Sequence, residues 1–394
     1  MRCLYIVFDG LLTPNSRGGG YVIYYEQLFA LIELGVEIVL WHQATPAERI
    51  HFEEWTRNEP DVWEGVQTRC ASVELSTISP AFSLPQRMSY HLRKLFWPEE
   101  HVPAPNLRHE YLRVVERARP DFVWAQHLEP AALAISQQVV PVIYSHHDWL
   151  YRIQALRSGK MENPRNRATE LGVVRRATAV VSGSVTECRE LEAAGCKCVN
   201  YIPISYVPVN VDWRLFDATR PRLVHLGGMG TTASREGLRR FFEVVWPQLK
   251  EERVDLEVIG DISRAPEPLK RLLAEVKCRG FVANLAGLLR PGDIHIIAWE
   301  QNTGQRTRLP LAFNHGQVVV ATRASVACFP EARDGENCRL VSQLADMAGV
   351  ILELRRDREQ RIKLAQNARR TFEQSFTRSA LLPRYAEVLA AVQS

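Results

Sequence analysis

Two arginines stand just ahead of a long apolar run in the second half of the sequence. The stretch reads TGQRTRLPLAFNHGQVVVAT over residues 303–322, with Arg306 and Arg308 on either side of Thr307. Alternate residues of an extended segment point to the same side, so an extended conformation would aim both guanidinium groups at one ligand. Two guanidinium groups can hold a diphosphate through paired hydrogen bonds. The alternative is a solvated turn that leads into a core helix.

Two glycine-rich turns are candidates for contact with phosphate. RGGGY at 17–21 lies between a predicted strand and a predicted helix, and LGGMGTT at 226–232 repeats this arrangement later in the chain. Glycine lets the backbone come close to a phosphate, and a helix N-terminus supplies N–H donors and the positive end of its dipole. One such turn in each half suits a diphosphate held between two domains. A flexible connection is the alternative for the first turn, which matches neither the G-x-G-x-x-G fingerprint nor a P-loop.

Histidines and an aspartate follow two other predicted strands. YSHHDW at 144–149 ends one of them, and His127 ends another. Ligands of open α/β sheets collect at the carboxyl ends of the strands. His147 beside Asp148 could therefore orient a sugar hydroxyl or hold a proton. The alternatives are that Asp148 caps the following helix and that His127 is structural.

Several classes of protein are disfavoured by what the sequence lacks. No D-x-D occurs, so a carboxylate-held magnesium–nucleotide site is not expected, and H-E-x-x-H, G-x-S-x-G and paired C-x-x-C motifs are also missing. A net charge of +4 does not imply nucleic acid. No apolar run approaches the roughly 20 residues of a membrane span. The eight cysteines are scattered, which indicates free thiols in a cytoplasmic protein.

The elements that would position these residues alternate between strands and helices. A strand at 3–10, a helix at 21–35 and a strand at 36–42 form a first β-α-β unit, and further strands are predicted at 119–127, 139–147 and 177–184. A proline-rich segment at 201–221 interrupts the pattern, which then restarts. We therefore predict an α/β fold of two Rossmann-like domains, 1–205 and 206–378, with a C-terminal helix at 379–394 packed back on the first domain. An insert at 82–105 would be a lid, a membrane-surface patch or an ordinary helix and loop.

This pattern resembles the retaining glycosyltransferases of family 4, the group 1 type, with their GT-B architecture of two Rossmann-like domains facing across a cleft. The resemblance spans nearly the whole chain as pattern rather than identity. Segments that carry it are GGGYVIYYEQLFALIELGVEIVL, RPDFVWAQH, PVIYSHHDW, LVHLGGMGTTASREGLRRFFEVVWPQL and LEVIGD with VKCRGFVANL. In the opening stretch Gly304, Arg306 and Arg308 match family positions, while Leu311 takes the place of a glutamate that usually binds the nucleotide ribose.

The resemblance implies a glycosyltransferase that needs no metal or other cofactor and takes its sugar from a nucleotide-sugar donor. Its acceptor would be a glycan, a lipid-linked molecule or a small molecule, with peripheral contact to the inner face of a membrane as a further expectation and no nucleic acid. We expect catalytic residues at His147, Asp148, Arg306 and Arg308, and acceptor contacts at His127 and Arg152. The expected donor-binding residues are Gly18, Gly19, Gly20, Gly228, Gly230, Arg235, Glu300, Thr303, Gly304, Thr307 and Glu331. A non-catalytic binding protein of this fold and a nucleotide-sugar epimerase are the alternatives.

Overall fold

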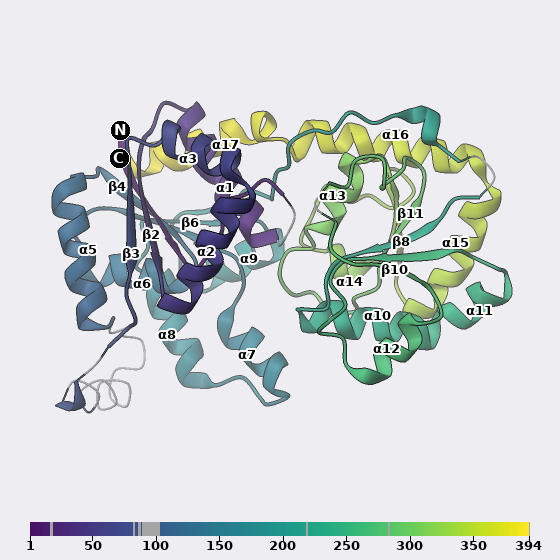
Figure 1. Cartoon of the computed structure of the whole chain (residues 1–394), viewed down its shortest axis with the longest axis horizontal. Helices are drawn as coiled ribbons and strands as arrows, with labels where there is room; N and C mark the ends of the chain where they lie inside the picture. The colour runs from purple at the N-terminus through teal and green to yellow at the C-terminus, as the bar shows by residue number, and fades with distance from the viewer. Residues whose placement is uncertain are drawn as a thin grey trace. The chain divides into compact units, whose positions relative to one another are not determined.

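The structure, a computed structural model of the chain, describes residues 1–15, 19–81, 83–85, 88, 103–217, 220–282 and 284–393. Gly18 and most of the 82–105 insert lie outside these residues. The described chain divides into two compact units, Met1–Pro203 with Leu381–Ser394, and Ile204–Ala380. We call them the N-terminal unit and the C-terminal unit (Figure 1).

A seven-stranded parallel sheet forms the centre of the N-terminal unit, in the order β3-β2-β1-β4-β5-β6-β7. Every residue of β4, β5 and β6 is buried. Continuous apolar strands of this kind are typical of a parallel sheet covered on both faces. The strands are β1 (Arg2–Phe8), β2 (Glu37–Ala44), β3 (Ser72–Thr77), β4 (Phe122–Gln126), β5 (Val142–His146), β6 (Ala179–Ser182) and β7 (Val199–Tyr201).

Helices cover both faces of this sheet and build a separate apolar core on each. The last helix, α17, packs on the sheet through Leu381, Tyr385 and Val388, and the Tyr385 ring lies 6.0 Å from that of Trp124. The helices are α1 (Gly19–Glu33), α2 (Pro46–Asn58), α3 (Pro60–Arg69), α5 (Pro105–Ala118), α6 (Leu128–Gln137), α7 (Leu150–Ser158), α8 (Pro164–Val174), α9 (Val185–Ala193) and α17 (Arg378–Gln393).

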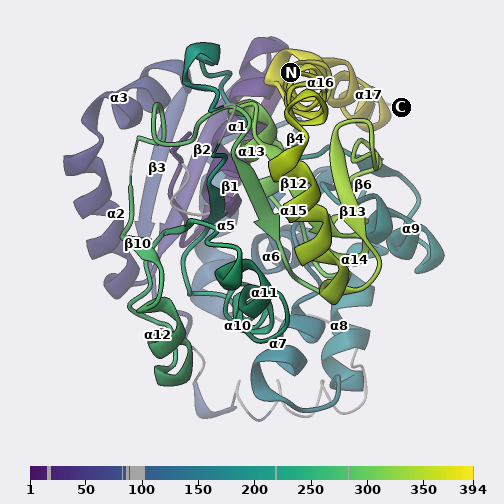
Figure 2. The same ribbon diagram turned by 90° about the vertical axis from the view of Figure 1, so that its right-hand side faces the viewer.

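The C-terminal unit repeats this design with a six-stranded parallel sheet in the order β10-β9-β8-β11-β12-β13. Helix α10 buries Leu238, Phe241 and Phe242 against it, and α15 lies along β12 (Figure 2). The strands are β8 (Leu223–Leu226), β9 (Leu256–Ile259), β10 (Lys277–Arg279), β11 (Ile294–Ile297), β12 (Val318–Thr322) and β13 (Cys338–Val341). The helices are α10 (Thr232–Val244), α11 (Trp246–Glu251), α12 (Glu267–Leu273), α13 (Arg308–Asn314), α14 (Arg323–Val326), α15 (Met347–Arg356) and α16 (Arg358–Ser375).

Both sheets reverse their strand order at one point, between β1 and β4 in the first and between β8 and β11 in the second. Ligands of open α/β sheets bind outside the carboxyl ends of the strands at such a point. The prediction of two Rossmann-like α/β domains is thus confirmed. Ligand-binding residues are therefore expected in the turns that follow β1, β4, β5, β8 and β11.

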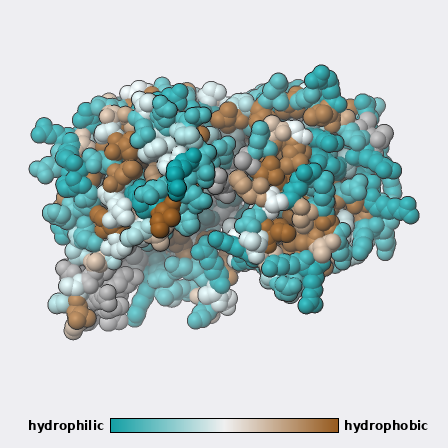
Figure 3. All heavy atoms as spheres, in the orientation of Figure 1, coloured by the Kyte–Doolittle hydropathy of each residue, from teal (hydrophilic) through white to brown (hydrophobic). Residues whose placement is uncertain are grey.

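The surface agrees with cores that lie inside each unit. On the face drawn in Figure 3, hydrophilic atoms predominate and apolar atoms form small separate groups. Among the described helices, none combines the length and the apolar character needed to cross a membrane. All eight cysteines carry free thiols, as the sequence predicted.

Candidate functional site

The glycine-rich turn after β8 lies at the switch point of the C-terminal unit. Gly227 has φ +140°, and Gly260, which follows β9, has φ +139°. A Cβ added to Gly260 would lie 2.6 Å from the carbonyl carbon of Gly227, so the two turns pack backbone to backbone. Glycine is required at both positions because L side chains rarely adopt this φ. The turn leads into α10, where the Thr231 side chain accepts a hydrogen bond from Ser234 N and caps the helix.

Arg308 is the first residue of α13, and its guanidinium group packs against this turn. Nη2 donates to Ser234 Oγ at 2.6 Å, and Nη1 lies 3.3 Å from His225 Nε2. A Cβ on Gly227 would come within 3.1 Å of the Arg308 Cζ. The guanidinium group is thus held by one strand residue, one residue of the first turn of α10 and a glycine that leaves room for it. We call Gly227, His225 and Ser234 the Arg308 cradle.

The charge of Arg308 is not balanced by the protein. In the part of the chain that the structure describes, no carboxylate lies within ion-pair distance of it. Burial, together with the nearby charge of Arg306, lowers the pKa of Arg308 to about 10, so the group is still charged at neutral pH. Arg308 is partly buried, and a charge withdrawn from water without a carboxylate partner is costly to maintain and suits a site that receives an anion.

Arg306 does not lie alongside Arg308 on an extended segment, so that premise of the sequence analysis is wrong. Thr307 has helical dihedral angles and α13 begins at the next residue. Arg306 Nη2 instead donates to the carbonyl of Thr303 and to its Oγ1 at 3.1 Å, and its Cζ lies 5.9 Å from the centre of the Trp299 ring. The turn folds the arginine back because Gly304, at φ +61°, reverses the chain there.

Four other predicted donor residues of this unit lie in or near the glycine-rich turn or directly before α13. Gly228 and Gly230 belong to the glycine-rich turn, and Arg235 Nη1 donates to the Met229 carbonyl at 2.9 Å and so holds that turn. The Thr307 carbonyl accepts from the Tyr206 hydroxyl at 3.1 Å. In the structure, the guanidinium group of Arg235 therefore binds the backbone of the glycine-rich turn.

Two glutamates, Glu300 and Glu331, were among the expected donor-binding residues. Glu300 is exposed, and its Oε2 lies 3.3 Å from Arg240 Nε on the outer side of α10. The Glu331 carbonyl accepts from Asn337 Nδ2 at 2.8 Å. Leu311 lies in α13, one turn after Arg308, and is 7% exposed, so an apolar side chain fills the place where the family carries its carboxylate.

In the N-terminal unit three aromatic rings meet at the carboxyl ends of β4 and β5. His127 and His147 stack with ring centres 4.0 Å apart, and the Tyr24 ring from α1 stands edge-on to both, at 5.6 and 5.4 Å. Gly20, in the first turn of α1, lies over the Tyr24 hydroxyl, 3.8 Å from it when a Cβ is added, and Gly19 starts the helix. The structure thus brings together the N-terminus of α1 and both predicted histidines.

A chain of buried hydrogen bonds fixes the tautomer of His147. Gln126 Nε2 donates to the Tyr5 hydroxyl at 2.5 Å and to Gln27 Oε1 at 2.7 Å, which leaves Gln126 Oε1 as an acceptor 2.8 Å from His147 Nε2. His147 Nε2 must then carry the proton, and Nδ1 keeps its lone pair. Burial also lowers the pKa of His147 well below 6.5, so the ring is neutral. It can accept a hydrogen bond from a hydroxyl at Nδ1.

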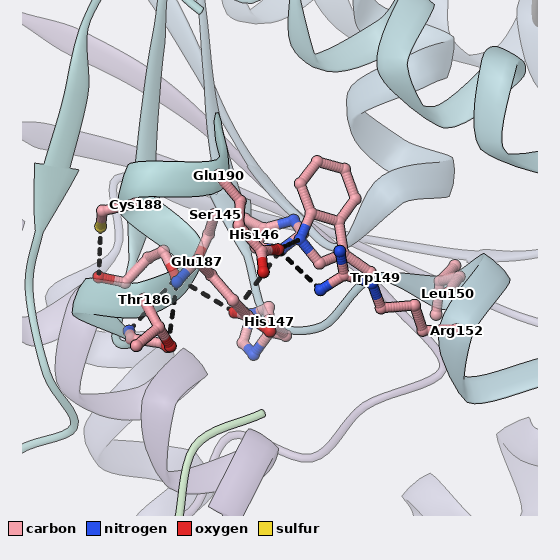
Figure 4. Close-up of polar contacts among 12 residues, drawn as sticks. Ser145, His146, His147, Trp149, Leu150, Arg152, Thr186, Glu187, Cys188 and Glu190 are labelled. Carbon is pink, nitrogen blue, oxygen red and sulfur yellow. Dashed lines mark hydrogen bonds and ion pairs between the residues drawn. The ribbon is translucent and has the colours of Figure 1, made fainter. Parts of the chain in front are cut away.

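A second buried pair lies directly beneath this group (Figure 4). His146 Nε2 is 3.5 Å from Glu187 Oε2, and its Nδ1 is 3.1 Å from the Tyr144 hydroxyl. Burial lowers the pKa of His146 to about 3 and, together with Asp148, raises the pKa of Glu187 well above its usual value. Burial thus disfavours both the charged imidazole of His146 and the charged carboxylate of Glu187. The charge of Asp148 adds to the rise in the pKa of Glu187.

The N-terminus of α7 is capped by a residue that the sequence analysis missed. Leu150 N and Tyr151 N donate to the two oxygens of Glu170, from α8, at 3.0 and 3.2 Å. The N-cap residue is Trp149, without a side-chain bond, so the alternative that Asp148 caps this helix is wrong. Burial raises the pKa of Glu170 to about 7. No local signal could have found a cap that lies twenty residues further along the chain.

Arg152, predicted to contact an acceptor, already has protein partners. Its Nη1 lies 2.6 Å from Glu190 Oε2, which also accepts from Trp149 Nε1 at 2.7 Å (Figure 4), and its Nε lies 3.7 Å from Glu162. Its positive charge is thus compensated, in contrast with that of Arg308.

Two further acidic groups follow β1 and β2 at the same edge. Burial and a hydrogen bond with Glu48 raise the pKa of Asp9 to about 7, and Asp9 has φ +54°.

Across the described residues, no group of three or more histidine, cysteine, aspartate or glutamate side chains is arranged to hold a metal ion.

Comparison with known proteins agrees with this geometry. Residues 220–357 match the family model described as glycosyl transferases group 1. No curated protein matches the sequence. Among solved structures, the sucrose-phosphate synthase of Thermosynechococcus elongatus is similar with a TM-score of 0.72 at 14% identity, covering 99% of this chain and 98% of that one.

Two other similar structures have sugar-related ligands in their descriptions. HepE of Anabaena, in complex with UDP-glucose, aligns with a TM-score of 0.66 at 15% identity over 99% of this chain and 100% of that one. Staphylococcus aureus TarM, in complex with fondaparinux, alpha-GlcNAc-glycerol and UDP, aligns with a TM-score of 0.69 at 10% identity over 100% of both chains.

The two parallel sheets have the GT-B fold that these solved structures share. The family match covers residues 220–357, which lie in the C-terminal unit, and makes that part of the chain similar to glycosyl transferases of group 1.

Proposed function

We propose that this protein is a retaining, metal-independent glycosyltransferase that moves a sugar from a nucleotide-sugar to a hydroxyl group of an acceptor in glycan or glycoconjugate biosynthesis. The observation that carries the proposal is the partly buried, uncompensated charge of Arg308 in its cradle beside the N-terminus of α10. A diphosphate is the part of such a donor that this arrangement suits.

The donor side follows from charge. As the bond from the sugar to the diphosphate breaks, negative charge grows on the leaving oxygens, and a fixed guanidinium group stabilises it more than it stabilises the bound donor. Arg308 is fixed by two hydrogen bonds, and the remaining N–H groups of its guanidinium are left for the ligand. The Gly228–Gly230 turn would let phosphate oxygens reach the N–H groups at the start of α10. Arg306 would add a second positive charge to the same region.

The same charges support a reaction without a metal ion. Enzymes that hold a magnesium–nucleotide complex supply carboxylates for the metal, and the sequence contains no D-x-D. Here the positive charge would come from arginine and a helix N-terminus instead. This is the reason for proposing that no cofactor is required.

The acceptor side is proposed for the N-terminal unit. His147 offers an accepting Nδ1, and the stacked His127 and the Tyr24 ring offer an apolar and aromatic surface for a sugar ring. A neutral histidine can hold a hydroxyl hydrogen without being a strong base. This suits a retaining reaction in which the hydroxyl attacks on the face that the diphosphate leaves, since no protein nucleophile is then needed. Asp148 would tune this edge through its charge.

The descriptions of HepE and TarM name UDP together with sugars, and this supports a uridine nucleotide as the first donor to test. A cytoplasmic location with peripheral membrane contact remains part of the proposal. The rival functions are a non-catalytic binding protein, favoured by Leu311 in place of a carboxylate, and an epimerase of the same fold.

Thermal unfolding across UDP-, GDP-, ADP- and dTDP-sugars, each with and without EDTA, tests the donor. A ligand at about 100 times its dissociation constant should stabilise the protein by about 2.7 kcal/mol. The stabilising donor is then incubated with glycan and glycerol acceptors, and products are identified by mass spectrometry and anomeric NMR. Transfer with retained configuration in EDTA supports the proposal, whereas isomerisation, binding without turnover or a metal requirement contradicts it.

A further inference from the structure

We infer that His225 is a positioning residue which holds Arg308 without neutralising it, so that the arginine's charge is kept for the ligand; this rests on the proposed donor site. His225 lies in β8, is 2% exposed and points its Nε2 at Arg308 Nη1, 3.3 Å away. The contact joins β8 to the first residue of α13, two positions that are 83 residues apart in the sequence.

The donor and acceptor roles in this contact are fixed by chemistry. Arginine has only donors, so His225 Nε2 must accept and must carry no proton. The proton of the neutral ring is then on Nδ1, which is buried and has no hydrogen-bond partner in the structure. Burial and the Arg308 charge keep the pKa of His225 well below 6.5, so the ring holds this state across the physiological range.

The second contact of the cradle has the same character. Ser234 Oγ accepts from Arg308 Nη2 at 2.6 Å and is a neutral hydroxyl, itself held by Thr231 Oγ1 at 2.9 Å. Both groups that orient the guanidinium are therefore neutral acceptors. They fix its direction and leave its net charge at +1.

Arg222, immediately before the same strand, shows the opposite arrangement. Its guanidinium is paired with two buried carboxylates, Asp293 Oδ2 at 2.5 Å and Glu257 Oε2 at 2.8 Å. A carboxylate at such a distance cancels the field of an arginine, because opposite charges attract strongly in the protein interior. Arg222 is thus held by carboxylates that cancel its charge, whereas Arg308 is held by neutral acceptors that do not. This difference supports the role inferred for His225.

The inference is tested by two substitutions of nearly equal shape that differ in charge. His225→Gln keeps a neutral acceptor near Arg308, and His225→Glu places a carboxylate there. UDP, GDP, ADP and inorganic pyrophosphate are titrated into the wild type and both variants by calorimetry, with thermal unfolding measured in parallel. We expect His225→Gln to bind within about threefold of wild type and His225→Glu to lose about 30-fold or more at an undiminished melting temperature, since it gains an ion pair at the expense of the ligand.

The outcomes separate the inference from the proposed function. If none of the four probes binds the wild type, the proposed function fails, and the inference fails with it. If a probe binds the wild type and its affinity is equal in His225→Gln and His225→Glu, the inference alone is overturned. Loss of binding in both variants to the same extent also overturns it, because the neutral acceptor should then have rescued the contact.

A second pair of substitutions covers the case in which His225→Glu does not fold. Ser234→Asn and Ser234→Asp change the other acceptor of Arg308 in the same way, from neutral to charged. The charged variant should again bind at least about tenfold more weakly than its neutral counterpart. Equal affinity in this pair would overturn the inference independently of His225.

Discussion

Replacing Arg308 by methionine should separate binding from stability. Burial lowers the pKa of Arg308 from 12.5 to about 10, and this difference corresponds to about 3 kcal/mol by which folding disfavours the charged group. The hydrogen bonds to Ser234 and His225 offset it, at about 1.5 kcal/mol or more each. The two contributions nearly cancel, so we expect Arg308→Met to change the free energy of unfolding by less than about 1 kcal/mol.

Binding should respond very differently. Two charge-assisted hydrogen bonds to a diphosphate are worth about 3 to 6 kcal/mol together, so affinity for the nucleotide should fall by a factor of roughly 100 to 10,000. The assay is calorimetric titration with the nucleoside diphosphate that stabilises the wild type, alongside chemical unfolding.

Arg222→Met is the matched control. It leaves the buried carboxylate of Asp293 without its arginine, whereas Glu257 keeps its ion pairs with Arg279 and Lys277, and it should destabilise the protein by about 3 to 5 kcal/mol. Where it remains folded, nucleotide affinity should be unchanged. The reasoning is refuted if Arg308→Met is as destabilised as Arg222→Met and still binds the nucleotide normally.

Three further changes have defined outcomes. Gly260→Ala places a Cβ 2.6 Å from a backbone carbonyl carbon, at a residue with φ +139°. It should lower the free energy of unfolding by more than about 1 kcal/mol. The control Gly280→Ala adds a Cβ with nothing within 4 Å and should change the free energy of unfolding little in the same melting experiment. Because the pKa of Glu170 is raised to about 7, its contribution to the free energy of unfolding is complete at acid pH and declines as pH rises to about 7. Glu170→Gln should flatten that decline when the free energy of unfolding is measured between pH 4.5 and 8. A pH profile equal to that of the wild type would contradict this prediction. His147→Phe should reduce sugar transfer by about 100-fold with nucleotide affinity unchanged, and the exposed control His51→Phe should match the wild type in both assays.

The periodicity of the sequence was sufficient to predict the two sheets. Strands buried on both faces, such as β5 and β12, appear as unbroken apolar runs, and α10 shows its buried face at helical spacing. The local conformation before α13 was harder to predict. The sequence there contained a usable sign, because Pro310 is tolerated in the first turn of a helix and so favours a helix start near Arg308 over an extended segment.

The partners of the site residues could not be predicted in the same way. The contact of Arg308 with His225 joins positions 83 residues apart, and that of His147 with Gln126 joins positions 21 apart on neighbouring strands. Such contacts depend on the order of strands in the sheet and on side-chain direction, which no local pattern contains. The net charge around a site residue cannot be predicted from a local pattern either, because it depends on all the charged groups that the fold brings near that residue.

The path of the chain through the two units has a consequence for how the protein can be divided. The C-terminal unit is one continuous segment, 204–380, whereas the N-terminal unit needs both ends of the chain, with Gln393 Nε2 donating to Met1 Sδ at 2.6 Å (Figure 1). Expression of 204–380 alone should give a folded product, while truncation before α17 should expose the apolar surface beneath Leu381 and Tyr385.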